Sequence, residues 1–297
     1  MRVHLVDGTF ELYRAHYSHR PAKSVTLADG PMDVKATAGL VASMLGLLHD
    51  PDEAVTHLAI AFDNPIRSFR NDLFDAYKGD EGVPPELRKQ FDLAELAMKA
   101  LGIVTWSMDR WEADDALGTA ATRFAAEAEQ VRILTPDKDL GQCVQGTRVV
   151  QVDRMRRKLI DEDAVRAVRG VAPASIPDLL GLVGDTSDGI PGLAGFGAKS
   201  AAIVLSRWGS IERIPDDVNG WDVKVTGAPR LAATLAANRE DALLYKKLAT
   251  LVTDVPLPET LADLEFRGVP RSSFATLCEQ LDAKDLRARP VRWRAPS

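Results

Sequence analysis

The chain has few cysteines and no long hydrophobic run. Only two of its 297 residues are cysteine, Cys143 and Cys278, so we expect neither a disulfide framework nor a paired-cysteine metal site. The longest nearly uncharged stretch, residues 36–49, is too short to cross a bilayer. The N-terminus lacks the apolar middle and small-residue cleavage site of a signal peptide. These absences predict a cytoplasmic protein without a membrane segment.

Several familiar catalytic patterns are absent as well. The chain has neither a Gly-x-Ser-x-Gly nucleophile elbow nor a phosphate-binding P-loop. Its five histidines include one close pair, His16 and His19, with no partner at zinc-ligand spacing. The run Asp7-Gly8-Thr9 is similar to the start of a haloacid dehalogenase phosphatase, but Leu5 stands where the nucleophilic aspartate belongs. The sequence therefore argues against each of these chemistries.

What the chain does contain is an alternation of short apolar runs and helical patterns. The runs are continuous, which is typical of strands buried on both faces of a sheet. We expect strands at residues 3–6, 58–62 and 131–135, further strands at 102–106 and 148–152, and helices at 36–48, 85–101 and 112–128. This alternation predicts an α/β fold with a mostly parallel central sheet and helices on both faces.

The composition changes near residue 170. From there on, prolines and glycines separate short helical segments, and we expect no further strand. The C-terminal segment is basic and contains Lys284, Arg287, Arg289, Arg292 and Arg294. The change predicts an α/β domain over residues 1–170 and a mostly helical region over residues 171–297.

Carboxylates follow the predicted strands. The first three strands lead into Asp7, Asp63 and Asp137, at the edge of a parallel sheet where ligands bind. Further acids in the set are Glu112, Asp114, Asp115, Asp139, Asp185 and Asp188. Taken singly, such acids are often helix-start or turn residues. As a set, oxygen ligands without cysteine or histidine favour Mg²⁺, Mn²⁺ or Ca²⁺.

The net charge of −6 is compatible with a nucleic-acid partner if cations fill this acidic site. Nine of the 43 acidic residues belong to the set, which leaves the remainder of the chain with a small excess of its 37 basic residues. A mildly basic surface around such a site is compatible with DNA, whose binding would weaken as salt rises.

These motifs resemble those of the 5′-nucleases, a family of flap endonucleases, phage 5′-exonucleases and the 5′→3′ exonuclease domain of bacterial DNA polymerase I. The matching segments are Val6-Asp7-Gly8 with Tyr13-Arg14; Phe62-Asp63 with Phe69-Arg70 and Tyr77-Lys78; Glu112-Ala113-Asp114-Asp115; Thr135-Pro136-Asp137-Lys138-Asp139-Leu140; and Gly184-Asp185-Thr186-Ser187-Asp188-Gly189-Ile190-Pro191-Gly192. They run in the family's order over about residues 1–210. No polymerase domain follows, so the resemblance implies a free-standing enzyme.

The resemblance also implies an architecture and a metal site. A helical arch is expected at about residues 64–100, and a helix–three-turn–helix element at about residues 176–208. Two Mg²⁺ or Mn²⁺ ions about 4 Å apart would serve hydrolysis of a phosphodiester. One ion would be held by Asp7, Asp63, Glu112, Asp114 and Asp115, and the other by Asp137, Asp139, Asp185 and Asp188.

Several basic and aromatic residues match positions near the DNA in this family. Lys78 falls at the catalytic lysine, which neutralises charge on the scissile phosphate. Arg14 and Arg70 match basic positions that contact this phosphate or its neighbours. Tyr13 and Tyr77 are candidates for stacking on a base, although aromatic residues at helical spacing also belong to cores.

The segment from Pro191 to Ser200 resembles the hairpin of a helix-hairpin-helix unit. Gly192, Gly195 and Gly197 would let backbone N–H groups approach a phosphate at a helix start. Lys199 and Ser200 would complete the DNA contact, which lacks a base-edge component and so predicts binding without sequence preference. The resemblance implies a K⁺ ion here as well, with Ser187 or Ser200 as the hydroxyl ligand.

The chain departs from the family pattern at two positions. Glu81 stands where the family usually has an arginine, and Gly189 stands where an asparagine commonly follows the last aspartate. Because the metal ligands are intact, we expect hydrolysis to be retained. Glu81 is expected to affect how tightly the helical arch binds a DNA strand threaded through it, and therefore the balance between flap cleavage and exonuclease action.

The sequence therefore predicts a metal-dependent 5′→3′ exonuclease and flap endonuclease that acts on branched or 5′-ended DNA in replication and repair. Replication and repair proteins are the expected protein partners. Two alternatives remain open at this point: an RNA-directed nuclease of the related PIN type, and a non-catalytic protein that recognises DNA junctions through the hairpin.

Overall fold

The computed structural model describes residues 1–27 and 30–295, and their contacts group them into two compact units. Unit 1 comprises residues 1–67, 80–135 and 253–297. Unit 2 comprises residues 68–79 and 136–252. Each unit is therefore made of separate segments of the chain. The domain boundary that the composition predicts near residue 170 divides the chain in another way, and it stays a prediction.

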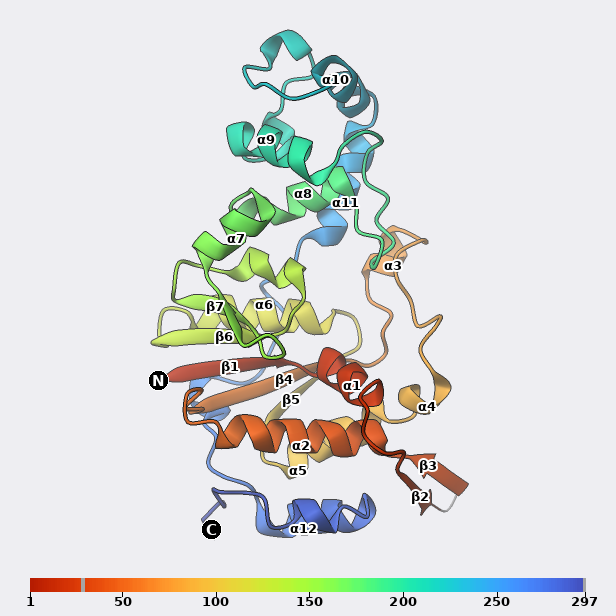
Figure 1. Ribbon diagram of the computed structural model, residues 1–297, viewed down its shortest axis with the longest axis vertical. Helices are drawn as coiled ribbons and strands as arrows, with labels where there is room; N and C mark the ends of the chain where they lie inside the picture. Colours follow the sequence, from red (N-terminus) through yellow and green to blue (C-terminus); the bar gives the residue numbers. More distant parts are fainter. Residues whose placement is uncertain (28–29, 296–297) are drawn as a thin grey trace. The chain divides into compact units, whose positions relative to one another are not determined.

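Four parallel strands form the centre of unit 1, in the order β5-β4-β1-β6 (Figure 1). They are β1 Arg2–Asp7, β4 His57–Asp63, β5 Val104–Met108 and β6 Gln130–Leu134. β1 and β4 are buried along almost their whole length, which explains their continuous apolar sequences. The register pairs Asp7 with Ala61, so Asp7 and Asp63 both lie at the carboxyl edge of the sheet.

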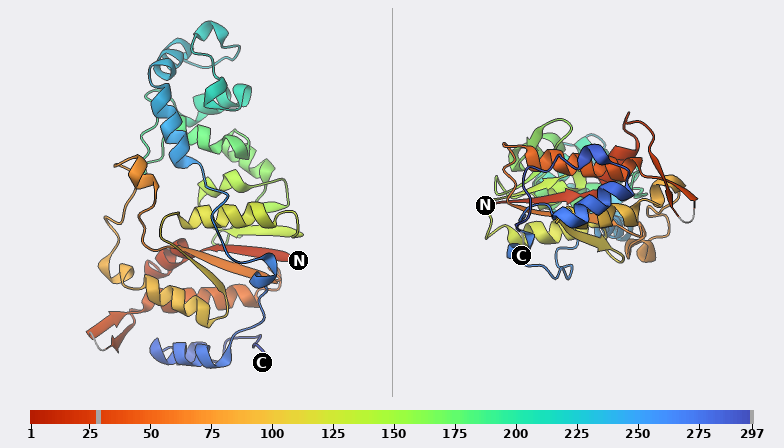
Figure 2. Two further views of the ribbon diagram at one scale, coloured as in Figure 1. Left: turned by 180° about the vertical axis from the view of Figure 1, so that it is seen from behind. Right: turned by 90° about the horizontal axis from the view of Figure 1, so that it is seen from below.

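Helices cover both faces of this sheet. α6 (Ala113–Phe124) packs across the four strands on one face, and α2 (Lys35–His49) and α5 (Phe91–Ala100) lie on the other (Figures 1 and 2). α12 (Arg271–Gln280) packs against α5. The predicted fold class is therefore confirmed. The other elements of unit 1 are α1 Gly8–His16, α4 Pro85–Arg88, the antiparallel pair β2 Ser24–Leu27 and β3 Gly30–Asp33, and the short turns η5 Leu261–Leu264 and η6 Lys284–Leu286.

Unit 2 is mostly helical. Its strands β7 (Val149–Asp153) and β8 (Lys158–Ile160) form an antiparallel pair. Its helices are α3 Arg70–Leu73, α7 Glu162–Arg169, α8 Ile176–Val183, α9 Ala198–Trp208, α10 Ala228–Ala237 and α11 Arg239–Ala249, with the turns η1 Lys138–Cys143, η2 Pro173–Ser175, η3 Ile211–Arg213 and η4 Val218–Gly220. One apolar core joins α8, α9, α10 and α11.

The predicted helix over residues 85–101 is wrong in one respect, since the structure divides it into α4 and α5. Gln90 causes the break. Its side-chain amide donates to the Glu86 carbonyl at 3.1 Å, while its backbone N–H bonds to Leu87 instead, at 2.8 Å. Its buried carboxamide oxygen also accepts from the Thr37 backbone N–H at 3.0 Å.

The predicted helix over residues 112–128 extends four residues beyond the C-terminal end of α6 and begins one residue early. α6 ends at Phe124, whose carbonyl accepts from the N–H groups of both Glu127 and Ala128 in a terminal turn. The short strands β2, β3 and β8 were not expected, because none has a continuous apolar run. In the described part of the chain, no helix has both the length and the apolar character needed to span a membrane.

Candidate metal centre and nucleic-acid interface

The first acidic cluster, made of Asp7, Asp63, Glu112, Asp114 and Asp115, lies in unit 1 where β1 and β4 end and α6 begins. Asp7 is buried, and its Oδ1 accepts from the Phe10 N–H at 2.8 Å, which caps α1. Its Oδ2 accepts from the Thr135 hydroxyl at 2.9 Å. Local capping thus fixes one carboxylate at the sheet edge.

The start of α6 brings the other four acids of this cluster together. Asp63 Oδ1 accepts from the Ala113 N–H at 2.8 Å, which ties the end of β4 to the first turn of the helix. Asp115 Oδ2 accepts from the Glu112 N–H at 2.9 Å. Glu112 and Asp115 are buried and Asp114 is partly exposed. The helix N-terminus stabilises negative charge here.

The second acidic cluster, made of Asp137, Asp139, Asp185 and Asp188, lies in unit 2. Asp137 Oδ1 accepts from the Asp139 N–H at 2.8 Å. Asp185 Oδ1 accepts from the backbone N–H and the hydroxyl of Ser187, at 2.9 and 2.5 Å. A short backbone pairing between Asp185 and Ile190 closes the loop that carries the last two acids.

Cationic side chains contact this second cluster. Lys138 Nζ lies 2.7 Å from Asp185 Oδ2, and Lys78 Nζ lies 3.0 Å from Asp188 Oδ1. Arg169 Nη2 lies 3.4 Å from Asp139 Oδ1.

Burial and mutual repulsion oppose ionisation of the carboxyl groups in the second cluster. Burial raises the pKa of Asp139 to about 7, with further increases from the carboxylates of Asp137, Asp185 and Asp188. Burial also opposes ionisation of Asp185, but hydrogen bonds from Lys138 and Ser187 outweigh it and lower the pKa of this carboxyl below its ordinary value. The four acids are therefore near enough to repel one another, and a bound cation would relieve that repulsion.

Within residues 1–27 and 30–295, no three His, Cys, Asp or Glu side chains are already arranged to coordinate a metal ion. The ion pairs of Lys138 and Lys78 account for part of this, because their ammonium groups stand against Asp185 and Asp188. The available ligand atoms of both clusters are carboxylate oxygens, and the carboxylates of Asp137, Asp185 and Asp188 give Asp139 a negative electrostatic environment. The clusters thus fit hard divalent ions once these lysines exchange partners.

Lys78, predicted as the catalytic lysine, is fixed beside the second cluster. Its backbone N–H donates to the Asp188 carbonyl at 3.0 Å, in addition to the ion pair of its side chain. Asn71 Nδ2 donates to the carbonyls of Tyr77 and Lys78 at 3.2 and 2.9 Å. Tyr77 itself is buried in the core of unit 2, a placement that gives it a packing role rather than the predicted base stacking.

Gly189 explains one departure from the family pattern. Its φ is +74°, and a Cβ at this position would lie 2.1 Å from the Ala76 carbonyl oxygen. The segment before Lys78 therefore approaches the backbone of residue 189 too closely for a side chain. Glycine at this position permits the contact between Lys78 and Asp188.

We expect Gly189→Ala to lower the free energy of unfolding by about 2–4 kcal/mol, since backbone atoms must move apart. Gly209→Ala is the matched control, because Gly209 has a φ of +80° but no atom within 4 Å of its added Cβ. We expect Gly209→Ala to lower the free energy of unfolding by only about 1 kcal/mol. Urea unfolding of both variants measures the difference, and equal losses would show that the close approach is unimportant.

Arg70 is placed differently from its prediction. It is 1% exposed, its Nε donates to the Leu248 carbonyl at 2.8 Å, and its Nη2 donates to the Thr250 carbonyl at 2.9 Å. These carbonyls end α11, so Arg70 anchors the end of that helix to the segment that leads to Lys78. In this structure Arg70 is a positioning residue, because a guanidinium so buried is not available to a phosphate.

Arg14 and Tyr13 lie on α1 in unit 1. Arg14 Nη2 contacts the buried Glu11 carboxylate and donates to the Ser43 hydroxyl at 2.7 Å, which orients the guanidinium. Tyr13 is partly buried and lies edge-on to Phe91, with ring centroids 6.5 Å apart. Burial raises the pKa of Tyr13, and the charges of Tyr17 and Asp63 raise it further.

The predicted hairpin joins α8 to α9 in unit 2. Gly192 and Gly195 have φ values of +68° and +92°, and Leu193 and Phe196 between and after them are buried. Gly197 precedes the first turn of α9, where the Ser200 hydroxyl accepts from the Gly197 N–H at 3.0 Å. Lys199 is exposed in this first turn. The predicted helix, turn and helix are therefore all present.

Sequence reasoning missed several residues that shape the clusters. Thr135 and Lys138 lie within the motifs, and their spacing next to the acids could have singled them out. Ser187 was considered only as a K⁺ ligand, and its hydrogen bond to Asp185 was not expected. Asn71 and Arg169 carry no such signal.

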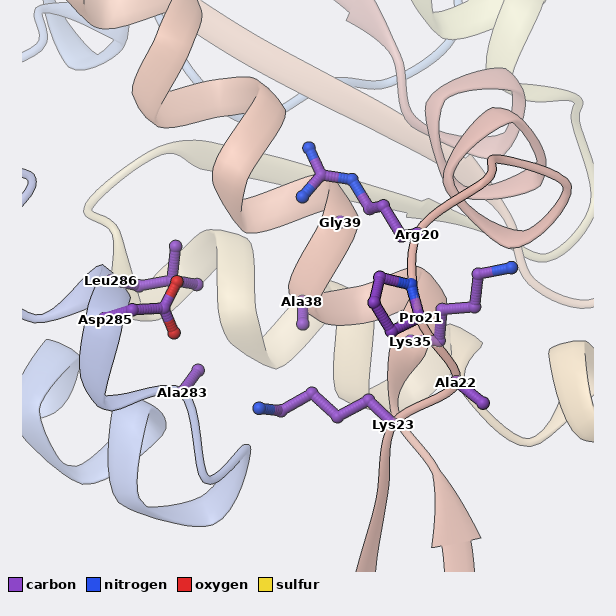
Figure 3. Close-up of a pocket in the computed structure, with 10 residues that line it drawn as sticks. All are labelled: Arg20, Pro21, Ala22, Lys23, Lys35, Ala38, Gly39, Ala283, Asp285 and Leu286. Atoms are coloured by element: carbon purple, nitrogen blue, oxygen red, sulfur yellow. The ribbon is translucent and has the colours of Figure 1, made fainter.

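A separate cavity of about 320 Å³ lies in unit 1, bordered by the chain after α1, the start of α2 and η6 (Figure 3). Two of its cations hold the protein's own backbone. Lys23 donates to the Asp282 carbonyl at 2.8 Å, and Lys35 donates to the carbonyls of His16 and Ser18 at 2.7 and 2.8 Å. No acid of either cluster lines this cavity, so it is not the candidate site.

Comparison with known families gives two matches. Residues 2–170 match the 5′-3′ exonuclease, N-terminal resolvase-like domain, and residues 171–272 match the 5′-3′ exonuclease, C-terminal SAM fold. DNA polymerase I of Bacillus caldotenax is 34% identical over 283 residues, which cover 93% of this chain and 31% of that protein. DNA polymerase I of Pseudomonas aeruginosa is 35% identical over 292 residues, which cover 95% and 30%. The chain thus spans about a third of these relatives.

Solved structures share the fold at low sequence identity. T5 5′-exonuclease with bound zinc superposes with a TM-score of 0.65 at 18% identity, over 85% of this chain and 90% of that one. The bacteriophage T5 flap endonuclease in a complex with DNA and metal ions gives 0.63 at 18% identity, over 85% and 90%. Human GEN1 with Holliday junction DNA gives 0.61 at 13% identity, over 94% and 68%.

Proposed function

The chain belongs to the 5′-3′ exonuclease family, and on this premise we propose that it hydrolyses phosphodiesters in branched or 5′-ended DNA with the help of divalent metal ions. The observation that carries the proposal is the second acidic cluster, where burial and the three neighbouring carboxylates together raise the pKa of Asp139 to about 7. Such a cluster is costly to a fold unless a cation binds there.

In this proposal the first acidic cluster holds one ion and the second acidic cluster holds the other, with some ligands acting through water. When bound, two Mg²⁺ or Mn²⁺ ions lower the pKa of a water molecule and stabilise the leaving oxygen. The protein's own part is to place the carboxylates: α1 capping fixes Asp7, and the Ser187 turn fixes Asp185.

The basic residues complete the proposed site. Lys78 neutralises charge on the scissile phosphate, and its backbone bond to Asp188 keeps the ammonium beside the second cluster. Arg14, oriented by Glu11 and Ser43, contacts a neighbouring phosphate. Arg70 donates to the Leu248 carbonyl at the end of α11 and so holds in place the segment that leads to Lys78.

The hairpin supplies binding without sequence preference. Backbone N–H groups at the exposed start of α9 and the Lys199 ammonium face a DNA phosphate, and no base edge is contacted. A K⁺ ion at this element, replication and repair proteins as partners, and a cytoplasmic location belong to the same proposal.

A cleavage assay on an end-labelled 5′-flap duplex tests the function. We expect products with Mg²⁺ or Mn²⁺ and none with EDTA, and the two metals run separately should show the balance of flap cutting to exonuclease action. Cutting that persists in EDTA would contradict the proposal. Equal cleavage of single-stranded RNA and flap DNA would support a PIN-type RNA nuclease, and metal-independent binding with no products would support a junction-binding protein.

We expect Lys78→Gln to lower kcat about 10²–10³-fold, because one preorganised positive charge at the phosphate is lost. Lys224→Gln removes an exposed lysine of unit 2 and serves as the control, with cleavage unchanged. Single-turnover kinetics on the same flap measures the rate. A Lys78→Gln rate within threefold of the parent would remove Lys78 from the proposed site.

A further inference from the structure

The arginine segment, residues 287–294, follows η6 in unit 1 (Figure 1). Four of its eight residues are arginine and none is acidic. Its first arginine pairs with Glu279, with Nη1 and Oε1 3.7 Å apart. The other three, Arg289, Arg292 and Arg294, are exposed, and no carboxylate in the described part of the chain lies within ion-pair distance of them. Three positive charges can therefore meet an anionic partner without breaking an ion pair.

Backbone contacts hold this segment in place. The Val269 N–H donates to the Arg292 carbonyl, and the Arg294 N–H donates to the Val269 carbonyl, both at 2.9 Å. Between them, the Trp293 ring packs on the buried ring of Phe274, with centroids 6.1 Å apart. Because side chains alternate along an extended chain, Arg292 and Arg294 share the other side, with Cα atoms about 7 Å apart.

Arg271, from the start of α12, adds a further exposed cation to this surface. Its guanidinium carbon lies 4.6 Å from the centroid of the Trp293 ring. A guanidinium stacked on an aromatic ring keeps its N–H donors directed outward, in the fork that matches a phosphate group. No ion pair engages Arg271 within residues 1–27 and 30–295.

The acids nearest to this surface are already engaged. Three carboxylates border the same hollow as Arg294. Each has a partner of its own, since Glu259 accepts from the Trp106 indole at 2.8 Å, Asp263 from the Thr260 hydroxyl at 2.6 Å, and Glu265 from Arg267 at 3.0 Å. They therefore leave the charge of Arg294 unpaired.

This surface is separate from the first acidic cluster. Arg292 and Val55 border one hollow, and Arg294 and Val104 border another, so the arginines lie beside the chain that enters β4 and β5. Asp63 lies at the opposite, carboxyl end of β4. Since β4 has seven residues, about 20 Å separate the two ends.

We propose that the arginine segment, together with Arg271, binds the phosphate backbone of a duplex arm of the DNA substrate. The choice of DNA rests on the proposed function. Arginine forks bind phosphates bidentately, and a run of like charges without acids favours a polyanion. A duplex that leaves the first acidic cluster covers 20 Å in about six base pairs, so only an arm longer than this reaches the arginines.

Fluorescence anisotropy with labelled flap DNA in EDTA tests the proposal. The test variant combines Arg289→Gln, Arg292→Gln and Arg294→Gln, all at exposed positions. On a flap with arms of about 20 base pairs, we expect binding at least about tenfold weaker than that of the parent. The slope of log Kd against log salt should fall by about 2–3, because three phosphate contacts are lost.

The matched control removes the same net charge from arginines that already have carboxylate partners. It combines Arg166→Gln, Arg207→Gln and Arg267→Gln, whose partners are Glu162, Asp222 and Glu265. We expect its affinity and salt slope to equal those of the parent. Equal weakening of both triple variants would overturn the proposal, since net charge alone would then explain the loss.

Arm length gives an independent measurement. Each duplex arm in turn is shortened to about 5 base pairs and closed by a hairpin loop, a length that does not span 20 Å. For one of the two arms, we expect shortening to abolish the difference between parent and test variant. A difference that survives shortening of either arm, or no difference on any substrate, would overturn the proposal.

These binding measurements are separable from the proposed function, because they need neither metal nor cleavage. A parent chain that shows the arm-length dependence but cuts no flap in Mg²⁺ would support the arginine surface and refute the nuclease function. A parent chain that cuts the flap while the test variant binds like the parent would do the reverse.

Discussion

Asp115→Asn is expected to lower the cleavage rate at least 10³-fold, which corresponds to about 4 kcal/mol of lost transition-state stabilisation. Asp115 is 0% exposed, and its Oδ2 accepts from the Glu112 N–H at 2.9 Å. An asparagine can keep this hydrogen bond through its carbonyl oxygen, but it has no negative charge to offer a metal ion. Single-turnover cleavage with Mg²⁺ measures the loss, and DNA binding in EDTA should be unchanged.

Asp178→Asn is the control for a buried carboxylate without a proposed metal role. Asp178 pairs with Lys246 at 2.8 Å and accepts from the Ile211 N–H at 2.8 Å. Its loss should lower stability by about 1–3 kcal/mol and leave the cleavage rate of the folded protein intact. If Asp115→Asn unfolds the chain, or cuts within tenfold of the parent rate, Asp115 has a structural role instead.

Asp139→Asn is expected to stabilise the metal-free protein at pH 8 by about 2 kcal/mol. The folded pKa of Asp139, about 7, lies above its ordinary value of 3.8. Between pH 3.8 and about pH 7, Asp139 keeps its proton in the folded state but has lost it in the unfolded chain. The free energy of unfolding therefore falls as the pH rises through this range. Asparagine cannot ionise, so the Asp139→Asn variant avoids this loss of stability, which reaches its full size only above pH 7.

Urea unfolding in EDTA at pH 4.5 and pH 8 measures this effect. We expect a clear gain at pH 8, little gain at pH 4.5, and loss of flap cleavage in the same variant. Asp163→Asn, at an exposed position on α7, removes an equal charge and should change stability by a few tenths of a kcal/mol. A gain at pH 4.5 equal to that at pH 8 would mean that repulsion among the acids is not its source.

The fold was predictable where the sequence signal is local and strong. Continuous apolar runs identified β1 and β4, because strands inside a parallel sheet are buried on both faces. The shorter apolar run of β6, which Arg132 interrupts, was enough to identify that strand as well. The break at Gln90 was not predictable, because it depends on a hydrogen bond to Thr37, 53 residues away. β2 and β3 lack the apolar pattern altogether.

The residues of the candidate site, too, were predictable only where the sequence signal is local. The acids that follow β1 and β4 were predictable from strand ends, and Asp7 and Asp63 indeed lie there. The proximity of Asp139 to Asp185 came only from the resemblance, since 45 residues separate them and no periodicity connects them. Burial of Arg70 and Tyr77 was not predictable either, because it depends on the carbonyls at the end of α11 and on the core of unit 2.

The most direct test is anomalous diffraction from crystals soaked in Mn²⁺. The account predicts one manganese ion bound by carboxylate oxygens of the first acidic cluster and a second bound by those of the second acidic cluster, with the ammonium groups of Lys78 and Lys138 displaced from Asp188 and Asp185. Saturated crystals with no manganese at either cluster, and with both lysine pairs intact, would contradict it.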